Sequence, residues 1–429
     1  MDVTIIAVIL GTVLLFVLLA LGSPFYIAFL ASSIPILLWG AGQGGLSLGA
    51  LASDNLRSLT MTMIPLYILL GNIMLVSGAT KLLFDAARVL VGGLRAGLGM
   101  AVVVANGMFG AVCGSAVAAA AAFSRIVLPE LGRSGYNREV SAAICGGSAG
   151  LSLMIPPSLV FIVLGDVLGV SIGDLFVAGF VPGIILVGIL CIAVHLLVRG
   201  KPEIKPEQHY SWGERGRTIL RAVPVAIIPL AIIGTIYGGI ATPTEAAGVS
   251  ILVALLLAVF YFRRFGGKEA KTCLRNTVVS SAAIFCIMIG ALIYGRALAF
   301  MQIPQTLAAT VAGLDLGLNA FRLVFFGLFF FLGMFLDPFV IVFVCLPPLL
   351  PAIALYPAIA GDLVSFAIMF TFILILSGLT PPVCIILYSA SSGAGADSGG
   401  TIKESRYFLA AVAMVTLLVL FVPAIGGVY

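Results

Sequence analysis

Long apolar runs, separated by short polar or glycine-rich segments, extend along almost the whole chain. A transmembrane helix needs about 20 mostly apolar residues, and several runs reach or approach that length. These runs cover residues 3–21, 25–39, 61–77, 176–198, 221–239, 246–262 and 277–299. The pattern therefore predicts an all-α, polytopic membrane protein.

Two Pro-Pro pairs interrupt apolar sequence that would otherwise continue as membrane helix. They lie in MIPPS at residues 154–158 and in LTPPV at residues 379–383. Proline removes a backbone donor and clashes with the preceding turn, so each helix must break and leave carbonyl groups without intrahelical partners. Broken backbone is tolerated at membrane depth only inside protein or beside a watery cavity, and paired breaks are typical of transporter binding sites.

Two other segments are predicted to enter the membrane and turn back. Residues 97–133 are rich in Gly and Ala, and the pieces on either side of Gly114 are each short for a full crossing. We therefore predict a re-entrant hairpin with its tip near Gly114. The apolar run that ends in GMFLDP at residues 333–338 is a second hairpin candidate. Charges spaced along residues 79–95 indicate an amphipathic helix at the membrane interface.

The order of these segments is repeated. Residues 1–198 and 221–429 each contain two spans, a third long element, a hairpin, a broken helix and a closing span, and residues 199–220 form a basic linker. An odd number of crossings per half makes the two halves inverted repeats. Two crossings separate the linker from the basic loop at 263–275, so the positive-inside rule assigns both segments to the cytoplasm.

Composition and charge exclude several classes of function. The chain is 62% hydrophobic and 9% charged, whereas soluble domains carry about 25% charged residues, so no soluble domain is expected. The net charge of +5 comes mostly from short basic loops and indicates orientation, not nucleic-acid binding. We expect no zinc site, disulfide framework or cofactor, because the cysteines and histidines form no CxxC motif or cluster.

Two other classes of function are weakly supported by the residue types. A membrane-embedded enzyme would need convergent nucleophiles, bases or metal ligands, and the sequence has no HExxH motif and no intramembrane histidine pair. A passive channel would show polar or charged rings along its pore, and such residues are scarce in the apolar runs.

Five stretches together resemble the large membrane subunit of the tripartite ATP-independent periplasmic (TRAP) transporters. They occur in the family's order and the resemblance covers nearly the whole chain: GSAVAAAA (114–121), MIPPSLVFIVLGDVLGVSIGDLFVAGFVPG (154–183), GGIATPTEAAGV (238–249), LGMFLDPFVIVFVCLPPLLP (332–351) and SGLTPPV (377–383).

The resemblance implies a sodium-coupled, elevator-type secondary transporter in the bacterial inner membrane. Its solute would be a small organic acid delivered by a periplasmic solute-binding protein. The family also needs a small membrane subunit of about four helices, which is not fused to this chain and is expected as a separate partner.

The resemblance further implies which residues bind the ions and the solute. One sodium site would involve Ser115, Ser152, Met154 and Pro156. The other would involve Gly333, Ser377, Thr380 and Val383. Gly114, Ser158 and Pro381 would contact the solute.

Three positions depart from the family's pattern in the expected site. This chain has Ala119 where the family usually has an aspartate, Cys113 where it often has serine, and Ile386 where it usually has an asparagine. Each departure removes a polar group. Sodium and proton coupling therefore both stay open, as does a related carboxylate carrier that works without a binding protein.

Overall fold

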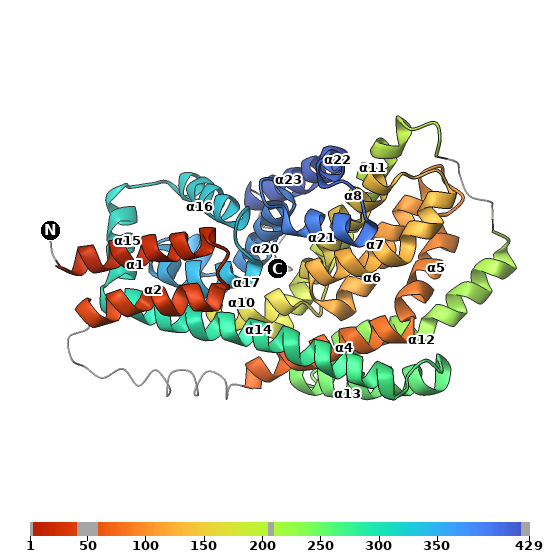
Figure 1. The fold of residues 1–429 in the computed structure, drawn as a ribbon, viewed down its shortest axis with the longest axis horizontal. Coiled ribbons are helices and arrows are strands. Elements are labelled where there is room, and N and C mark those ends of the chain that lie inside the picture. The colour runs from red at the N-terminus through yellow and green to blue at the C-terminus, as the bar shows by residue number, and fades with distance from the viewer. Residues whose placement is uncertain (1–2, 41–58, 205–209, 422–429) are drawn as a thin grey trace.

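The computed structural model describes residues 3–40, 59–204 and 210–421. Within these ranges every regular element is a helix, which confirms the predicted all-α class. Figure 1 shows an elongated bundle in which α14 runs along most of the molecule. Five described helices are long and apolar enough to cross a membrane, or seven if each of two bent pairs counts as one span.

The first half follows the predicted order of elements. Its helices are α1 (Val3–Ala20), α2 (Phe25–Gly40), α4 (Leu59–Ser77), α5 (Ala79–Val91), α6 (Gly97–Cys113), α7 (Ala116–Arg133), α8 (Arg138–Ala149), α9 (Leu151–Met154), α10 (Leu159–Leu168) and α11 (Ile172–Arg199). The α6–α7 pair is the predicted hairpin, and α8–α9 and α10 are the two parts of the first broken helix. Helix α5 bends away from α4 by 72° and buries one face, as expected of an amphipathic helix.

The second half contains the corresponding elements with more interruptions. Its helices are α12 (Trp212–Tyr237), α13 (Pro243–Leu256) with a π-turn at Leu257–Tyr261, α14 (Gly267–Phe300), α15 (Ile303–Gly313), α16 (Leu318–Gly333), α17 (Pro338–Val340) with a π-turn at Ile341–Cys345, a 3₁₀ turn at Pro347–Leu349, α18 (Leu350–Ile353), α19 (Pro357–Ala360), α20 (Leu363–Leu379), α21 (Ile385–Ala394), α22 (Ser398–Glu404) and α23 (Arg406–Phe421).

The two hairpins open toward opposite ends of the molecule, as the positions of α16 and of the α7–α8 region in Figure 1 show. The first opens beside the turn between α7 and α8, where Arg138 donates to the Gly395 carbonyl at 3.3 Å. At the same end Lys201, just after α11, pairs with Glu404 of α22 at 2.8 Å. The second hairpin opens at the other end, where the Tyr356 hydroxyl donates to the Leu316 carbonyl at 3.0 Å. This opposite orientation is the geometry that inverted halves require.

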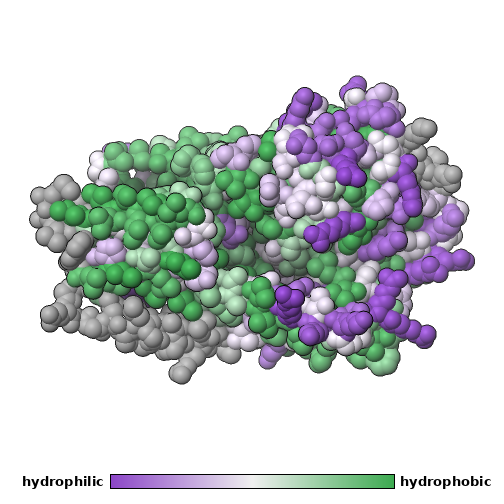
Figure 2. All heavy atoms as spheres, in the orientation of Figure 1, coloured by the Kyte–Doolittle hydropathy of each residue, from purple (hydrophilic) through white to green (hydrophobic). Residues whose placement is uncertain are grey.

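Polar side chains gather at one end of the molecule. Figure 2 shows them over the end that carries α5, the turn between α7 and α8 and the start of α12, while α1 and α2 present an almost wholly apolar surface. This end includes the start of α12, which follows the basic linker that the positive-inside rule predicts to be cytoplasmic.

Burial separates enclosed helices from lipid-facing ones. In the 31-residue stretch Arg138–Leu168, 89% of the most apolar window is buried, whereas in α12 only 22% is buried. Both stretches are strongly apolar, so the difference reflects packing rather than composition. The first broken helix and α20, the first part of the second broken helix, form the core, and α12, α13 and α14 expose apolar side chains as membrane-facing helices do.

One segment differs from the prediction in its local structure. Helix α12 begins at Trp212, so Arg215 and Arg217 lie on its first turns and not in an extended linker; residues 205–209 of that linker fall outside the described ranges. A capping box between Ser211 and Glu214 explains this early start. Further along the chain, α21 and the beginning of α22 occupy most of the Ser- and Gly-rich stretch 389–400.

Candidate functional site

Both hairpin tips and both broken helices meet at one small pocket of about 30 Å³, here called the central pocket. Gly114 and Ser115 line it from the first tip, and Gly333 and Asp337 line it from the second. The broken helices contribute Leu153, Leu374, Ser377 and Ile386. Four interruptions that are far apart in the sequence therefore converge at one place.

The first tip is tightly packed against the first break. Gly114 has φ +62°, and a Cβ atom there would lie 2.9 Å from Leu159 Cγ, so the tip approaches the start of α10 closely. One turn earlier, a Cβ on Gly110 would lie 2.7 Å from Ser152 Cα. Ser115 caps α7 by accepting a hydrogen bond from the Ala118 amide at 3.4 Å. Glycine is needed at both positions because the backbones approach so closely.

The first break is stabilised by serine side chains. It contains a cis Pro156–Pro157 peptide bond between α9 and α10. Ser158 donates to the Leu153 carbonyl at 2.7 Å and accepts from the Phe161 amide at 3.4 Å, so it satisfies a freed carbonyl and caps α10 at the same time. Ser152 donates to the Ala149 carbonyl at 2.5 Å.

The second tip contacts the second broken helix in a similar way. A Cβ atom on Gly333 would collide with the Ser377 side chain, so α16 and α20 pack directly against each other there. Asp337 caps α17 by accepting from the Phe339 amide at 2.9 Å. Among the described residues that line the central pocket, Asp337 is the only one with a charged side chain.

The second break lacks the serine cap of the first. It also has a cis Pro381–Pro382 peptide bond, and Thr380 donates to the Leu376 carbonyl at 2.7 Å. The residue after the Pro-Pro pair is Val383, which is 42% exposed, whereas the first break has the fully buried Ser158. Helix α21 begins at Ile385 without a side-chain cap. The two breaks are therefore alike in backbone and different in polarity.

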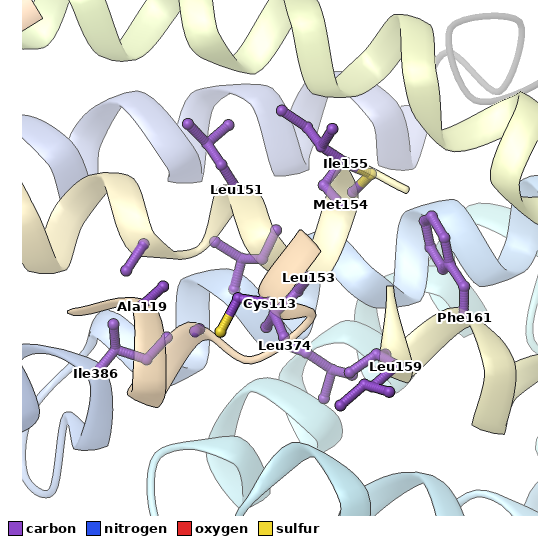
Figure 3. Packing of buried hydrophobic residues seen from close by; sticks show 14 of the residues in the cluster. Cys113, Ala119, Leu151, Leu153, Met154, Ile155, Leu159, Phe161, Leu374 and Ile386 are labelled. Carbon is purple, nitrogen blue, oxygen red and sulfur yellow. The ribbon is translucent and has the colours of Figure 1, made fainter. Parts of the chain in front are cut away.

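The three departures from the family pattern lie close to the central pocket. Cys113 is buried, and its thiol donates to the Ser115 carbonyl at 3.8 Å. Ala119 is fully buried in α7, and Ile386 lines the pocket. Figure 3 shows Cys113 at the first tip with Leu153 and Leu374 beside it, and Ala119 and Ile386 on neighbouring elements. Apolar contacts therefore surround much of the site.

The structure brings some of the predicted site residues together and leaves others apart. Gly114, Ser115, Gly333 and Ser377 line the central pocket. Ser152, Met154 and Ser158 are fully buried in or beside the first break. Pro156 lines a separate apolar pocket, Thr380 and Pro381 are half-buried, and Val383 is exposed. The ion-binding and solute-binding roles of all these residues stay predictions.

A second pocket of about 100 Å³ lies between the first hairpin tip and the long spans. Cys113 and Ser115 line it from the tip, and Asn72 of α4 and Ser280 of α14 line it from the spans. Asn72 donates to the Ile68 carbonyl at 3.0 Å and to Thr277 Oγ1 at 3.1 Å. Sequence reasoning missed Asn72, although an amide side chain inside the apolar run 61–77 was a usable signal.

Ser148 of α8 lies in a short sequence pattern that is typical of some enzymes. Residues 146–150 read GGSAG and fit the G-x-S-x-G pattern, which the sequence analysis overlooked. Ser148 is fully buried within α8 and donates to the Ile144 carbonyl at 2.6 Å, while the Asn106 side chain donates to it at 2.8 Å. A nucleophile needs an exposed turn and a base, so this serine has a packing role.

The chemistry available at the site is that of hydroxyls, carbonyls and helix N-termini. The described residues contain no group of three or more His, Cys, Asp or Glu side chains that could hold a metal ion. Carbonyl and hydroxyl oxygens suit hard cations, as Ca²⁺ and Mg²⁺ sites show. The amides at the starts of α7 and α10 suit an anionic group.

Comparison with known proteins gives a consistent result. Residues 12–425 match the family model described as the DctM component of the tripartite ATP-independent periplasmic transporter. The chain is 30% identical over 397 residues to a C4-dicarboxylate TRAP transporter large permease protein of Pseudomonas aeruginosa, covering 90% of this chain and 92% of that protein. It is 29% identical to an ectoine TRAP transporter large permease protein of Halomonas elongata, covering 95% of each.

Two further similarities concern length and fold. An isethionate TRAP transporter permease protein of Oleidesulfovibrio alaskensis is 30% identical over 379 residues, which are 87% of this chain and 59% of that longer protein. The YdaH transporter of Alcanivorax borkumensis, whose structure has an unusual topology, matches with a TM-score of 0.59 at 12% identity, covering 96% of this chain and 98% of that chain. At that identity the match supports the fold alone.

Proposed function

Because the chain belongs to the DctM component of the tripartite ATP-independent periplasmic (TRAP) transporters, we propose that it carries a small organic acid and sodium ions across the bacterial inner membrane. The family membership predicted from the sequence is thereby confirmed, and the chain is a multi-pass membrane protein of the large-permease type. The observation that carries the proposal is the convergence of two hairpin tips and two broken helices on the central pocket. We infer transport and not catalysis, since the relatives are named as transporter permeases.

Hydroxyl groups beside the breaks support ion binding. Ser377 and Thr380 each donate their proton to a carbonyl of their own helix, at 3.1 and 2.7 Å. A hydroxyl has one proton and two lone pairs, so these oxygens keep electron pairs for a cation. Together with carbonyls freed by the Pro-Pro pairs, they would bind sodium without burying a fixed negative charge.

The solute would be held by backbone amides. No lysine or arginine is among the described residues that line the central pocket or the pocket beside Asn72. The N-termini of α7 and α10 offer amide donors and a partial positive charge, which favour a carboxylate. The relatives' names include a dicarboxylate, ectoine and isethionate, so several acidic or zwitterionic solutes fit the proposal.

Transport would follow an alternating-access, elevator-type motion. The hairpins and broken helices would move as one group against the long spans, and solute and ions at the central pocket would move with that group. Sodium and solute would each favour the ordered breaks, so each would raise the affinity for the other. A periplasmic solute-binding protein would deliver the solute, and a small membrane subunit of about four helices would complete the assembly.

Uptake into proteoliposomes tests this function. The chain would be reconstituted with its small membrane subunit, and uptake of the cognate solute measured with binding protein, with and without an inward sodium gradient. Ser115→Ala and Thr380→Ala should weaken the sodium dependence while leaving the inserted amount unchanged. Thr310→Ala, on the exposed face of α15, is the matched control and should behave as wild type.

Each arm of this experiment has a distinct meaning. Unchanged sodium dependence in both variants would refute the assigned ion ligands. Uptake driven equally well by a proton gradient alone would show that protons, and not sodium ions, are coupled to solute uptake. Full uptake without the binding protein would favour the alternative of an independent carboxylate carrier.

A further inference from the structure

An apolar pocket of about 270 Å³ lies outside the central pocket, between α5, α6, α11 and α12. Leu83, Gly107, Pro156 and Val225 each contribute to its wall from a different element, and none of its described lining residues carries a charged or hydrogen-bonding side chain. Ile184 and Leu230 line it and are 53% and 60% exposed, so the pocket opens on the lipid-facing surface. We call it the α12 pocket.

One row of residues on α12 links this pocket to the basic end of the molecule. Arg217, Arg221, Val225, Pro229 and Ile233 follow one another at four-residue intervals, and such residues are neighbours on a helix surface. Val225, Pro229 and Ile233 line the pocket. Arg217 and Arg221 are exposed and continue the row toward the cytoplasmic end.

We propose that the α12 pocket binds one acyl chain of an anionic phospholipid, whose headgroup phosphate contacts Arg221 and Arg217. An apolar chain suits a pocket without hydrogen-bonding side chains, and it can enter from the bilayer through the open side. Basic residues beside pockets between membrane helices on the cytoplasmic side bind anionic lipid headgroups. In the row on α12, the apolar residues would contact the acyl chain and the two arginines would contact the headgroup phosphate.

The walls of the α12 pocket come from both groups of helices that the proposed elevator motion would move past each other. Gly107 belongs to the first hairpin, Pro156 to the first broken helix and Ile184 to α11, whereas Val225 belongs to a long outer span. A chain bound between them contacts both groups. Lipid occupancy would therefore depend on how the two groups are placed, whichever solute or ion the protein carries.

Lipid retention by the purified full-length chain tests the proposal. Native mass spectrometry would count bound phosphatidylglycerol or phosphatidylcholine after each lipid is added to the detergent-purified protein. Wild type should retain one phosphatidylglycerol in preference to phosphatidylcholine. Ala226→Phe should lower phosphatidylglycerol retention about tenfold, because the ring fills the pocket, while Ala231→Phe on the exposed side of α12 should not.

A second pair of variants separates headgroup from chain. Arg221→Gln should reduce the preference for phosphatidylglycerol over phosphatidylcholine but leave the binding of a chain intact, and Arg275→Gln on exposed α14 should change neither. Should Ala226→Phe fold poorly by size-exclusion chromatography, Ala226→Leu provides a smaller filling. Wild-type retention in a folded pocket-filling variant would overturn the proposal. A pocket-filling variant that retains lipid normally but no longer binds the small membrane subunit would also overturn it, because that subunit would then be the occupant of the pocket.

Discussion

Gly114 fixes the conformation of the first hairpin tip. It has φ +62°, which costs other residues about 1–2 kcal/mol, and an added Cβ would lie 2.9 Å from Leu159 Cγ. Gly114→Ala should therefore lower the midpoint of thermal unfolding and remove most solute uptake. Gly188→Ala is the matched control, since an added Cβ on this α11 glycine meets nothing within 4 Å. Wild-type uptake by Gly114→Ala would show that the tip tolerates another backbone geometry.

Asn72 is the amide side chain that the long spans place beside the first tip. It is half-buried and donates to the Ile68 carbonyl and to Thr277 Oγ1, so its side-chain carbonyl oxygen is the group that could accept a hydrogen bond from a hydroxyl or N–H group of a solute. Loss of a buried polar contact costs about 1–3 kcal/mol, and about 1.4 kcal/mol is a tenfold change in binding.

Substitution of Asn72 tests whether the neighbouring pocket receives solute. Asn72→Ala should raise the KM for solute uptake by about tenfold without lowering the amount of inserted protein. Asn276→Ala, exposed on α14, should leave the KM unchanged. An unchanged KM in Asn72→Ala would assign this residue to packing of α4 on α14.

At the scale of elements, the two broken helices differ in how their second parts begin. Ser158 caps α10 and also satisfies the Leu153 carbonyl, whereas Val383 at the corresponding place caps nothing. Loss of a serine cap costs about 1 kcal/mol. Ser158→Ala should therefore lower the thermal midpoint, and Val383→Ala should leave it close to wild type. Equal effects of the two substitutions would contradict the assigned difference between the breaks.

Most elements could be predicted because proline, glycine and charge mark their ends. The Pro-Pro pairs predicted both helix breaks, and the small residues around Gly114 predicted the first hairpin tip. The early start of α12 was harder to predict, because Arg215 and Arg217 resemble a solvated linker when the Ser211–Glu214 capping box is overlooked. In residues 389–394, which are rich in serine and small residues, packing of α21 against α7 and α8 accompanies a helix that local sequence does not mark.

The site was only partly predictable for a physical reason. Gly114, Ser115, Gly333 and Ser377 stand next to strong local signals, and the structure brings them to one pocket. Asn72 stands in an ordinary apolar run, and its place beside the tip depends on how α4 packs, which local sequence does not encode. Pro156 and Val383 belong to the breaks, but Pro156 lines the separate apolar pocket and Val383 is exposed, and neither lines the central pocket.

At the scale of the whole molecule, the helices form two groups. Helices α1, α2, α4, α12, α13 and α14 include the long, membrane-facing spans, and α2 and α4 pack along α14 (Figure 1). The hairpins, the broken helices and α11 pack around the central pocket. The proposed elevator motion requires these groups to slide past each other, so a covalent link between them should stop transport while a link within one group should not.

Two pairs of contacting residues allow that comparison. Tyr67 of α4 and Phe176 of α11 lie across the two groups, with ring centroids 6.2 Å apart. Thr12 of α1 and Tyr294 of α14 lie within the group of long spans, with hydroxyl oxygens 3.4 Å apart. Each pair would be replaced by cysteines in a variant whose seven native cysteines are removed. A short thiol cross-linker should abolish uptake by the 67/176 variant, and reduction of a cleavable linker should restore it, while the 12/294 variant keeps its uptake throughout. Undiminished uptake by fully cross-linked 67/176 protein would mean that α11 and α4 move together, and the elevator motion would then have to be rejected for these two groups.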